Sequence, residues 1–324
     1  MRTTPSKWNG NAPVGALRVS TPHIIPQKGA FVIIDECLRT ALQSIMFRIF
    51  VEKVLPMIDF HTHIFPDAVA PKALESLMAG ALRVEGATLA PCTDGTLAGL
   101  VSSMEENHVD VSVVLPIATK PSQTPSINRF AQGVQSASVH SFYSLHPMQE
   151  DRESVLEEIA RAGGKGIKLH PEFQYADVDS PEMLTILKKA AELGLLVVLH
   201  AGQDIGMPPP VHCTPRKLAR AMDAAPGCRI VAAHMGGWRM WTEAEACLVG
   251  REELWLDTAF VTDHLPPEQY LRMIRSHGAE RILFGSDSPW ESPAHTLEGL
   301  ERLGLSREEL QRITHDNAAA LLGL

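Results

Sequence analysis

Two histidines separated by a single residue are the first sign of chemistry in this chain. His61 and His63 follow a short apolar run that begins at Met57. In an extended strand, side chains two positions apart point to the same face, so both imidazoles should aim at one point in space. Such a pair suits two ligands of one metal ion. Because an isolated pair of this kind also arises by chance, other parts of the chain must support the interpretation.

The same pattern recurs along the chain, since short apolar runs repeatedly end in a histidine or an aspartate. The residues placed in this way are His146, His170, His200, His234, Asp257 and Asp287. A random scatter of the fourteen histidines would not place so many at the ends of apolar runs.

The apolar runs indicate eight strands separated mostly by helices. The expected strands are 57–60, 111–115, 142–145, 166–169, 195–199, 229–233, 254–256 and 281–284. The expected helices are 96–107, 151–161, 181–194, one from 215, 238–248, 267–276 and 307–322, with capping signals at Thr96, Ser180, Thr214, Gly194 and Gly278.

This alternation predicts an α/β fold, a (β/α)8 TIM barrel over residues 57–324 preceded by an N-terminal extension over residues 1–56. Strands that are apolar throughout suit a parallel sheet buried on both faces. An open doubly wound sheet is the alternative, but it predicts a glycine-rich phosphate loop after the first strand, and this sequence has none there. In a barrel the carboxyl ends of all strands meet at one rim, so the polar residues should converge.

Composition excludes several classes of protein. The net charge is −9, so nucleic acid is not an expected partner. The five cysteines are scattered with no CxxC, which fits a reducing cytoplasm and argues against a disulfide scaffold. No apolar run approaches the roughly 20 residues that span a bilayer.

The first 56 residues differ from the rest, because they are basic, rich in Pro, Ser and Thr at the start, and have no acidic residue before Asp35. They are predicted to be disordered and then helical from Ile34 to Leu55. Three interpretations remain open: a transit peptide, a helical appendage, or translated upstream sequence with Met57 as the true start, which we favour.

Several neutral imidazoles beside a carboxylate favour metal-assisted activation of water. This N/O donor set suits Zn²⁺, with Mn²⁺ or Fe²⁺ as alternatives. A bound metal lowers the pKa of a water ligand from about 15.7 to about 7. A further histidine near that water could then transfer its proton.

At this point the chain resembles the amidohydrolase superfamily, in the amidohydrolase-related branch that includes aminocarboxymuconate-semialdehyde decarboxylase. The matching segments are DFHTHIFP at 59–66, GIKLHPEFQ at 166–174, VVLHAG at 197–202, VAAHMGG at 231–237 and LFGSDSPW at 283–290. The resemblance implies a TIM barrel in which the metal ligands are His61, His63, His200 and Asp287. It also implies that His234 is the catalytic histidine and that Asp287 helps to orient the reacting water.

The number of metals stays open at the sequence level. Some relatives carboxylate a lysine and use it to bridge two metals, and Lys168 lies on the expected fourth strand. Because His170 lies nearer the strand end, we favour a single metal, most simply zinc, without excluding a second. Residues that could contact substrate are His170, His146, Lys168, Arg129, His212, Trp238 and Trp290, although local packing explains each almost as well.

We therefore expect a cytoplasmic metal-dependent hydrolase that acts on an amide, ester or lactone. The alternative is a non-oxidative decarboxylase of an aromatic or muconate-like acid, which would need a pocket arginine to hold the carboxylate. Arg129 and Arg239 are the arginines that can be placed near the mouth, and neither is compelling. A non-enzymatic metal-binding protein is a third, weaker interpretation. The expected partner is a small molecule, and a homodimer is left open.

Overall fold

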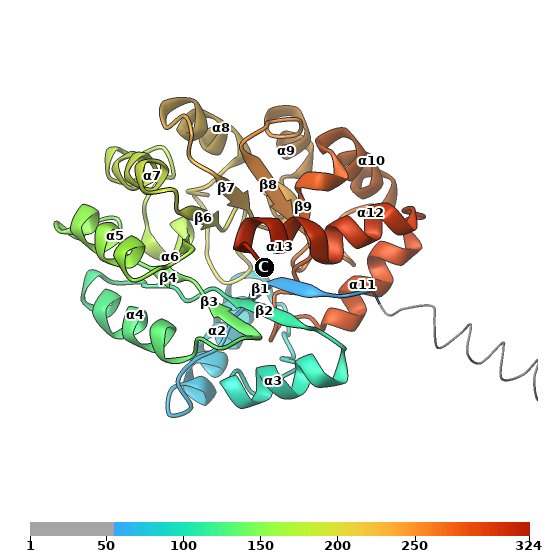
Figure 1. Ribbon diagram of the computed structural model, residues 1–324, viewed down its shortest axis with the longest axis horizontal. Coiled ribbons are helices and arrows are strands. Elements are labelled where there is room, and N and C mark those ends of the chain that lie inside the picture. The colour runs from blue at the N-terminus through green and yellow to red at the C-terminus, as the bar shows by residue number, and fades with distance from the viewer. Residues whose placement is uncertain (1–54) are drawn as a thin grey trace, which may run out of the picture. The chain divides into compact units, whose positions relative to one another are not determined.

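The computed structural model describes residues 55–324, so the predicted extension at 1–56 lies almost wholly outside the described residues. Within them, the strands form a ring that is surrounded by helices, as Figure 1 shows in a view down the ring. The strands are β1 (Ile58–Thr62), β2 (Val111–Val114), β3 (Val139–Ser141), β4 (Tyr143–Ser144), β5 (Gly166–Leu169), β6 (Leu196–Leu199), β7 (Ile230–Ala232), β8 (Leu254–Asp257) and β9 (Ile282–Leu283).

Every neighbouring pair of strands is parallel, in the order β1-β2-β3 and β4 to β9. The two sheets join where the amide of Phe142 donates to the carbonyl of Val114 at 2.8 Å. The ring closes where the amide of Phe60 donates to the carbonyl of Phe284 at 2.8 Å. The predicted TIM barrel is confirmed, with one correction: the expected strand 142–145 begins earlier and is interrupted at Phe142, between β3 and β4.

Helices surround the barrel in the alternation that the sequence predicted (Figure 1). The helices are α2 (Ala70–Glu85), α3 (Leu97–Glu106), α4 (Thr124–Gly133), α5 (Arg152–Arg161), α6 (Pro171–Gln174), α7 (Pro181–Leu193), α8 (Pro215–Ala224), α9 (Trp241–Cys247), α10 (Pro267–His277), α11 (Pro293–Arg302), α12 (Arg307–Gln311) and α13 (Asn317–Leu322). The caps expected at Thr96, Ser180 and Thr214 are present, because each side chain accepts a hydrogen bond from a first-turn amide.

The sequence prediction missed α2, α4, α6 and α11. No side chain caps the start of α2 or α4, and a proline near each first residue, Pro71 or Pro125, is the signal that the sequence offered for these helices. Helix α11 carries a capping signal as well, since Ser292 precedes a proline and its side chain accepts from the amide of His295. The predicted helix at 307–322 is α12 and α13 joined by a π-helical turn, Arg312–Asp316.

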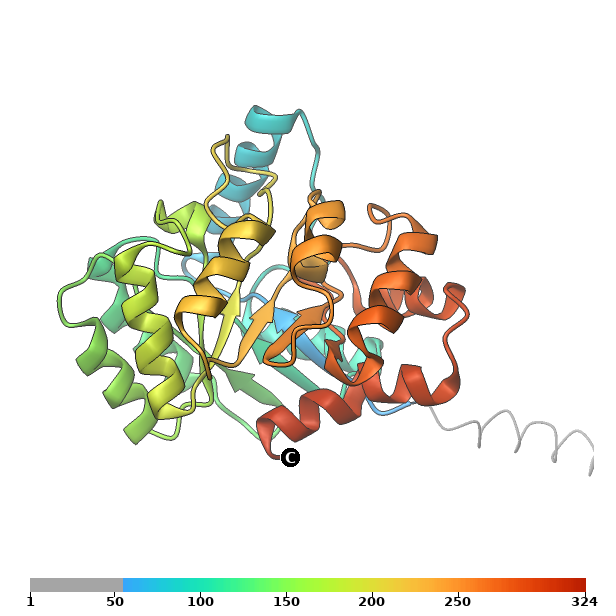
Figure 2. The ribbon, with the colours of Figure 1, turned by 90° about the horizontal axis from the view of Figure 1, so that it is seen from above.

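The core has two parts, and alternate residues of a strand belong to different parts. In β6, Leu196 and Val198 pack with the apolar residues of the other strands, whereas Val197 and Leu199 pack in the larger cluster that includes residues of the helices. Helix α13 adds Ala318 and Leu322 to the first cluster. In Figure 2, α13 lies at one end of the barrel and α2 stands at the opposite end, so the mouth near α2 is the end left for a site.

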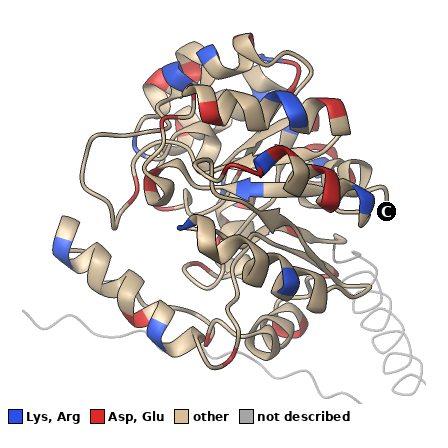
Figure 3. Cartoon of the chain, turned by 90° about the vertical axis from the view of Figure 1, so that its left-hand side faces the viewer, with Lys and Arg blue, Asp and Glu red and all other residues tan. Residues whose placement is uncertain are grey.

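The outer surface carries both signs of charge. Figure 3 shows Lys and Arg interspersed with Asp and Glu over the helices on one side of the barrel. None of the helices in the described part of the chain is both long and apolar enough to cross a membrane.

Candidate metal centre

The polar residues at the carboxyl ends of the strands converge on one pocket of about 400 Å³. His61 lies in β1, and His170, His200 and His234 follow β5, β6 and β7. These four line the pocket together with His63, Lys168 and Asp287. Residues more than 200 positions apart therefore meet at one mouth, as expected from the strand-end pattern.

His61, His63 and Asp287 form the tightest group in this pocket. The Nε2 atoms of His61 and His63 are 3.1 Å apart. One oxygen of Asp287 lies 3.4 Å from the first of these nitrogens and 3.1 Å from the second. The group is held together by the backbone, because the amide of Asp287 donates to the carbonyl of His61 at 2.9 Å.

The hydrogen bond made by Nδ1 of each ring shows whether its Nε2 atom carries a proton or a lone pair. Nδ1 of His63 lies 2.8 Å from the carbonyl oxygen of Leu115, which can only accept, so this nitrogen carries the proton. Nδ1 of His61 lies 2.8 Å from a carboxylate oxygen of Asp257 and donates to it. Both Nε2 atoms of the neutral rings are then lone pairs. Two lone pairs and a carboxylate oxygen facing one another repel unless a cation lies among them.

His234 and His200 repeat this arrangement next to the first group. Nδ1 of His234 donates to the carbonyl of Ala259 at 2.8 Å, and Nε2 of His200 donates to the carbonyl of Gln203 at 3.0 Å. The remaining nitrogens of the two rings face each other at 3.1 Å. The ring of His234 also lies 5.3 Å from that of His61, so the two groups are continuous.

Burial keeps the imidazoles of His61 and His200 in their neutral form. Desolvation, reinforced by the Lys168 ammonium, lowers the pKa of His61 well below its ordinary value. Desolvation also lowers the pKa of His200, with a smaller contribution from His170. Neutral imidazoles and an ionised carboxylate are the forms that bind a metal ion.

These residues fit a divalent metal ion. Unprotonated nitrogens of His61 and His63 and an oxygen of Asp287 lie within 4.8 Å of one another and make an N/O set of the kind that zinc prefers, whereas His200 lies in a neighbouring group with His170 and Asp204. The donors are oriented from behind, since each ring donates its other N–H to an acceptor.

Asp257 is a site residue that the sequence analysis did not select. It ends β8 and is fully buried, and one oxygen accepts from the amides of His234 and Ala259 while the other accepts from His61. It therefore orients one imidazole and fixes the backbone of another. Its position at the end of an apolar strand was the available signal. Asp59, by contrast, is a buried structural carboxylate that accepts from the amide and hydroxyl of Ser286, and desolvation raises its pKa to about 7.

Lys168 lies in the pocket as the sequence predicted. Its Nζ is 3.3 Å from Nε2 of His61, and the side chain is 1% exposed. Burial lowers the pKa of Lys168 to about 8, although Asp257 and Asp287 raise it. Among the residues that the structure describes, no carboxylate lies within salt-bridge distance of this ammonium.

The walls of the pocket are mostly apolar and aromatic, and they include the predicted Trp238 and Trp290. The aromatic side chains that line it are Phe65, Phe130, Phe173, Trp238, Phe260 and Trp290. Helix α2 closes part of the mouth, and its last residue, Glu85, forms an ion pair with Arg239 at 2.6 Å. Arg239 in turn lies over the ring of Trp238 at 4.1 Å.

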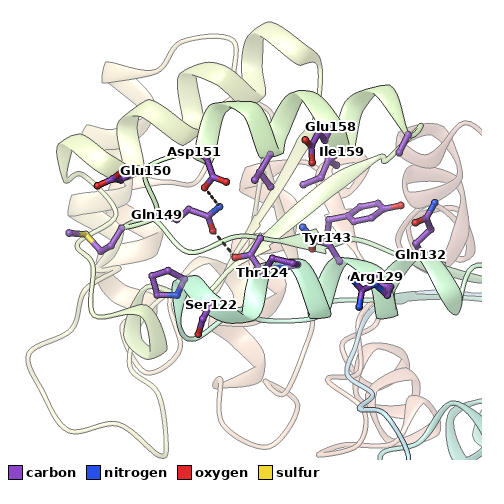
Figure 4. A pocket seen from close by; sticks show the side chains of 16 residues that line it. Ser122, Thr124, Arg129, Gln132, Tyr143, Gln149, Glu150, Asp151, Glu158 and Ile159 are labelled. Carbon is purple, nitrogen blue, oxygen red and sulfur yellow. Dashed lines mark hydrogen bonds between the residues drawn. The ribbon is translucent and has the colours of Figure 1, made fainter.

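Three predicted substrate residues lie elsewhere. His146 is buried in its own loop, where Nδ1 accepts from the amide of Met148 at 3.2 Å. His212 pairs with Asp177 at 2.9 Å. Arg129 lines a groove between α4 and α5 on the outside of the barrel (Figure 4). None of the three is among the residues that line the metal pocket.

The chain is similar to known proteins over the whole barrel. The family described as amidohydrolase matches residues 58–324. The γ-resorcylate decarboxylase of Rhodococcus jostii (strain RHA1) is 25% identical over 130 residues, which cover 35% of this chain and 40% of that relative. The chain thus matches less than half the length of this curated relative.

Solved structures share the barrel. An uncharacterized TIM-barrel protein from Bordetella bronchiseptica matches with a TM-score of 0.67 and 18% identity over 83% of this chain and 99% of that one. The 5-carboxyvanillate decarboxylase of Sphingomonas paucimobilis matches with a TM-score of 0.58 and 16% identity over 83% of this chain and 99% of that one. A protein assigned as a 2-pyrone-4,6-dicarboxylic acid hydrolase from Pseudomonas putida matches with a TM-score of 0.57 and 23% identity over 84% of this chain and 98% of that one. At these identities the likeness shows the fold.

Proposed function

Since this chain belongs to the amidohydrolase family, we propose that it is a metal-dependent, non-oxidative decarboxylase of an aromatic or similarly planar unsaturated acid. The family holds both hydrolases and decarboxylases, so the choice rests on the pocket. The curated relative and one of the structures compared above are decarboxylases.

The observation that carries the proposal is the buried cation at the floor of the pocket. The Lys168 ammonium is 1% exposed and lies beside His61. A buried charge without a close counter-ion is costly, so this site favours an anion supplied by the substrate. A carboxylate placed next to Lys168 would also lie beside the proposed metal ligands. A decarboxylase needs such a group, whereas hydrolysis of a neutral amide or ester does not.

The walls of the pocket support a flat substrate. Six aromatic side chains line a volume of about 400 Å³, which is within the usual range for a small-molecule site. Aromatic rings pack on a planar substrate face to face or edge to face.

The ligand set that we propose is His61, His63, His200 and Asp287. A divalent ion held there supplies Lewis-acid stabilisation of negative charge on the substrate. Lys168 binds the substrate carboxylate, and the aromatic walls exclude water and orient the ring. Asp257 keeps His61 in the tautomer that leaves Nε2 free.

His234 is the proposed proton carrier. Its Nδ1 proton is committed to the carbonyl of Ala259, so Nε2 is the atom that gains and loses a proton. The proton passes from Nε2 to the carbon that bears the carboxylate. The bond between this carbon and the carboxylate then breaks, CO₂ leaves, and the electron pair returns to the ring. The product keeps the proton, and solvent protonates His234 again.

Metal analysis tests the ligand set. Purified protein should contain about one divalent ion per chain, and His61→Ala and Asp287→Ala should each lose it. Retention of metal by both variants would refute the assignment. His234→Asn should keep the metal and lose most turnover, about 10²-fold or more for a proton-transfer group. An unchanged rate would remove His234 from the mechanism.

Lys168→Met tests the choice of reaction. We expect it to raise KM and lower the rate of CO₂ release from 2,6-dihydroxybenzoate and related acids while the metal stays bound. Lys165→Met is the matched control, since Lys165 is exposed and lies just before β5. If Lys168→Met releases CO₂ as fast as the natural chain, the carboxylate is not held by this residue.

A metal-dependent hydrolase that activates water is the second candidate. It is favoured by the closeness of His234 to the proposed ligands and by the likeness to the protein assigned as a 2-pyrone-4,6-dicarboxylic acid hydrolase. Acid production from 2-pyrone-4,6-dicarboxylate without CO₂ release would select it over decarboxylation.

We also propose that residues 57–324 are the catalytic unit. A chain that starts at Met57 should fold and keep full activity, whereas an insoluble or inactive product would show that residues 1–56 are required.

A further inference from the structure

His170 lies beside the proposed metal centre, but its hydrogen bonds give it a different chemical character. The residue follows β5, is buried and lines the pocket. Its Nδ1 accepts from the backbone amide of Phe173 at 3.3 Å. Because an amide can only donate, Nδ1 is a lone pair and the proton of the neutral ring is on Nε2.

The second nitrogen of His170 therefore presents a donor to the pocket. Nε2 lies 3.4 Å from a carboxylate oxygen of Asp204. His170, His200 and Asp204 lie close enough to suggest a second metal site. The tautomer argues against one, since His170 would have to give up its proton and break its bond to Phe173 before Nε2 could bind a metal.

Packing fixes the direction of this donor. The ring of His170 is stacked between Phe173 at 4.0 Å and His200 at 4.1 Å, with 13° between the planes in each case. The backbone is fixed as well, because the amide of His170 donates to Gln174, whose side chain donates to two barrel carbonyls. The imidazole can neither flip nor swing without breaking these contacts.

Asp204 is an equally fixed acceptor. One of its oxygens accepts from the amide of Gly206 at 2.8 Å, and the other faces His170. Gly206 itself lies against Gly80 of α2. The pocket wall thus carries a donor and an acceptor side by side. Their separation of 3.4 Å is longer than a good hydrogen bond, so neither group is fully satisfied.

We infer that His170 and Asp204 form a specificity pair that recognises a hydroxyl group on the acid substrate. The hydroxyl oxygen accepts from Nε2 of His170, and the hydroxyl proton is donated to Asp204. A hydroxyl is the small substituent that uses both partners at once, whereas an ether uses only the donor and an ammonium only the acceptor. The inference rests on the proposed function, because it requires that the substrate carboxylate lies at the metal centre.

Asp204→Asn is the sharpest test. The amide oxygen can still accept from Gly206, but the NH₂ group then faces the N–H of His170, so the acceptor for a hydroxyl proton is lost. Asp177→Asn is the matched control, since Asp177 pairs with His212 and Lys217 and does not line the pocket. The probes are benzoate, the three monohydroxybenzoates and their methoxy ethers, with binding to zinc-loaded full-length protein measured by calorimetry.

In the natural chain we expect at least one hydroxybenzoate to bind about tenfold or more tightly than benzoate and than its methyl ether. Asp204→Asn should remove this preference, so that the hydroxybenzoate binds no more tightly than benzoate. His170→Phe, which keeps the stacked ring but has no donor, should remove it too. Preference retained in either variant, or absent from the natural chain, overturns the pair.

Release of CO₂ from the same acids separates the two proposals. Turnover with an unchanged preference in Asp204→Asn overturns the specificity pair alone. A preference lost in the variant without turnover in the natural chain overturns decarboxylation and supports the pair. Failure of every acid to bind overturns both.

Discussion

Replacement of Asp257 by asparagine should weaken metal binding without weakening the fold. One oxygen of Asp257 accepts from two backbone amides, at 2.8 Å from His234 and 3.2 Å from Ala259. The side-chain oxygen of the introduced asparagine should keep that place, because two N–H donors face it. Its NH₂ group then faces Nδ1 of His61, which is a donor in the natural protein. The ring must move its proton to Nε2, the atom proposed to bind the metal.

The expected size of the effect follows from this tautomer shift. Loss of a group that orients a metal ligand typically reduces affinity by about 10- to 100-fold, or about 1.4 to 2.7 kcal/mol. The metal-free variant should not be destabilised to this extent, because a proton on Nε2 of His61 finds an acceptor 3.1 Å away in His63. Zinc should consequently raise the melting temperature of the variant less than that of the natural chain.

Zinc affinity measured by competition with a chromogenic chelator is the primary assay, and thermal unfolding of the metal-free protein is the check on the fold. Asp110→Asn is the matched control, since its carboxylate also accepts from a backbone amide, that of Met57, but lies outside the metal pocket. Affinity of Asp257→Asn within twofold of the natural chain would refute the tautomer argument.

Three further predictions concern stability and selectivity. Burial holds His277 neutral and lowers its pKa from 6.5 to about 4. Its contribution of about 3 kcal/mol to the free energy of unfolding is therefore present above pH 6.5 and is lost as the pH falls towards 4. The unfolding free energies of the natural protein and His277→Gln, measured by denaturant titration, should converge at low pH. Gly202→Ala should lower the free energy of unfolding by more than about 3 kcal/mol, because the new methyl group meets the backbone of Trp238. Gly194→Ala, at φ +68° in open space, should lower it by only about 1 to 2 kcal/mol in the same titration. Arg83→Met, at the exposed mouth of the pocket, should raise KM about fivefold for an acid with a second carboxylate and leave that of a monocarboxylate unchanged; equal effects on both would exclude a role for this charge.

Local pattern was enough to predict much of the fold. The barrel followed from apolar runs that alternate with capped helices, because each run needs burial on both faces and each cap marks a helix start. Helices that begin without a capping side chain, as α2 does at Val69, left no such mark. Their positions are decided by packing against the rest of the barrel, which no local pattern records.

The tertiary structure also changed our preference between hydrolysis and decarboxylation. From the sequence we preferred hydrolysis, because a decarboxylase should hold the carboxylate with a pocket arginine and Arg129 was a weak choice, while the role of Lys168 was left open. The fold places Arg129 in an outer groove and puts the Lys168 ammonium at the pocket floor. That placement now favours a carboxylate substrate.

The sequence by itself determined which side chains end the strands, and therefore that several imidazoles and a carboxylate gather at one rim. Only the tertiary structure decided which nitrogen of each ring faces its neighbours. That choice depends on acceptors far away in the chain, such as Asp257 for His61, Leu115 for His63 and Ala259 for His234. The sequence does not show which nitrogen of a neutral histidine carries the proton, because the hydrogen-bond partner of the other nitrogen decides it.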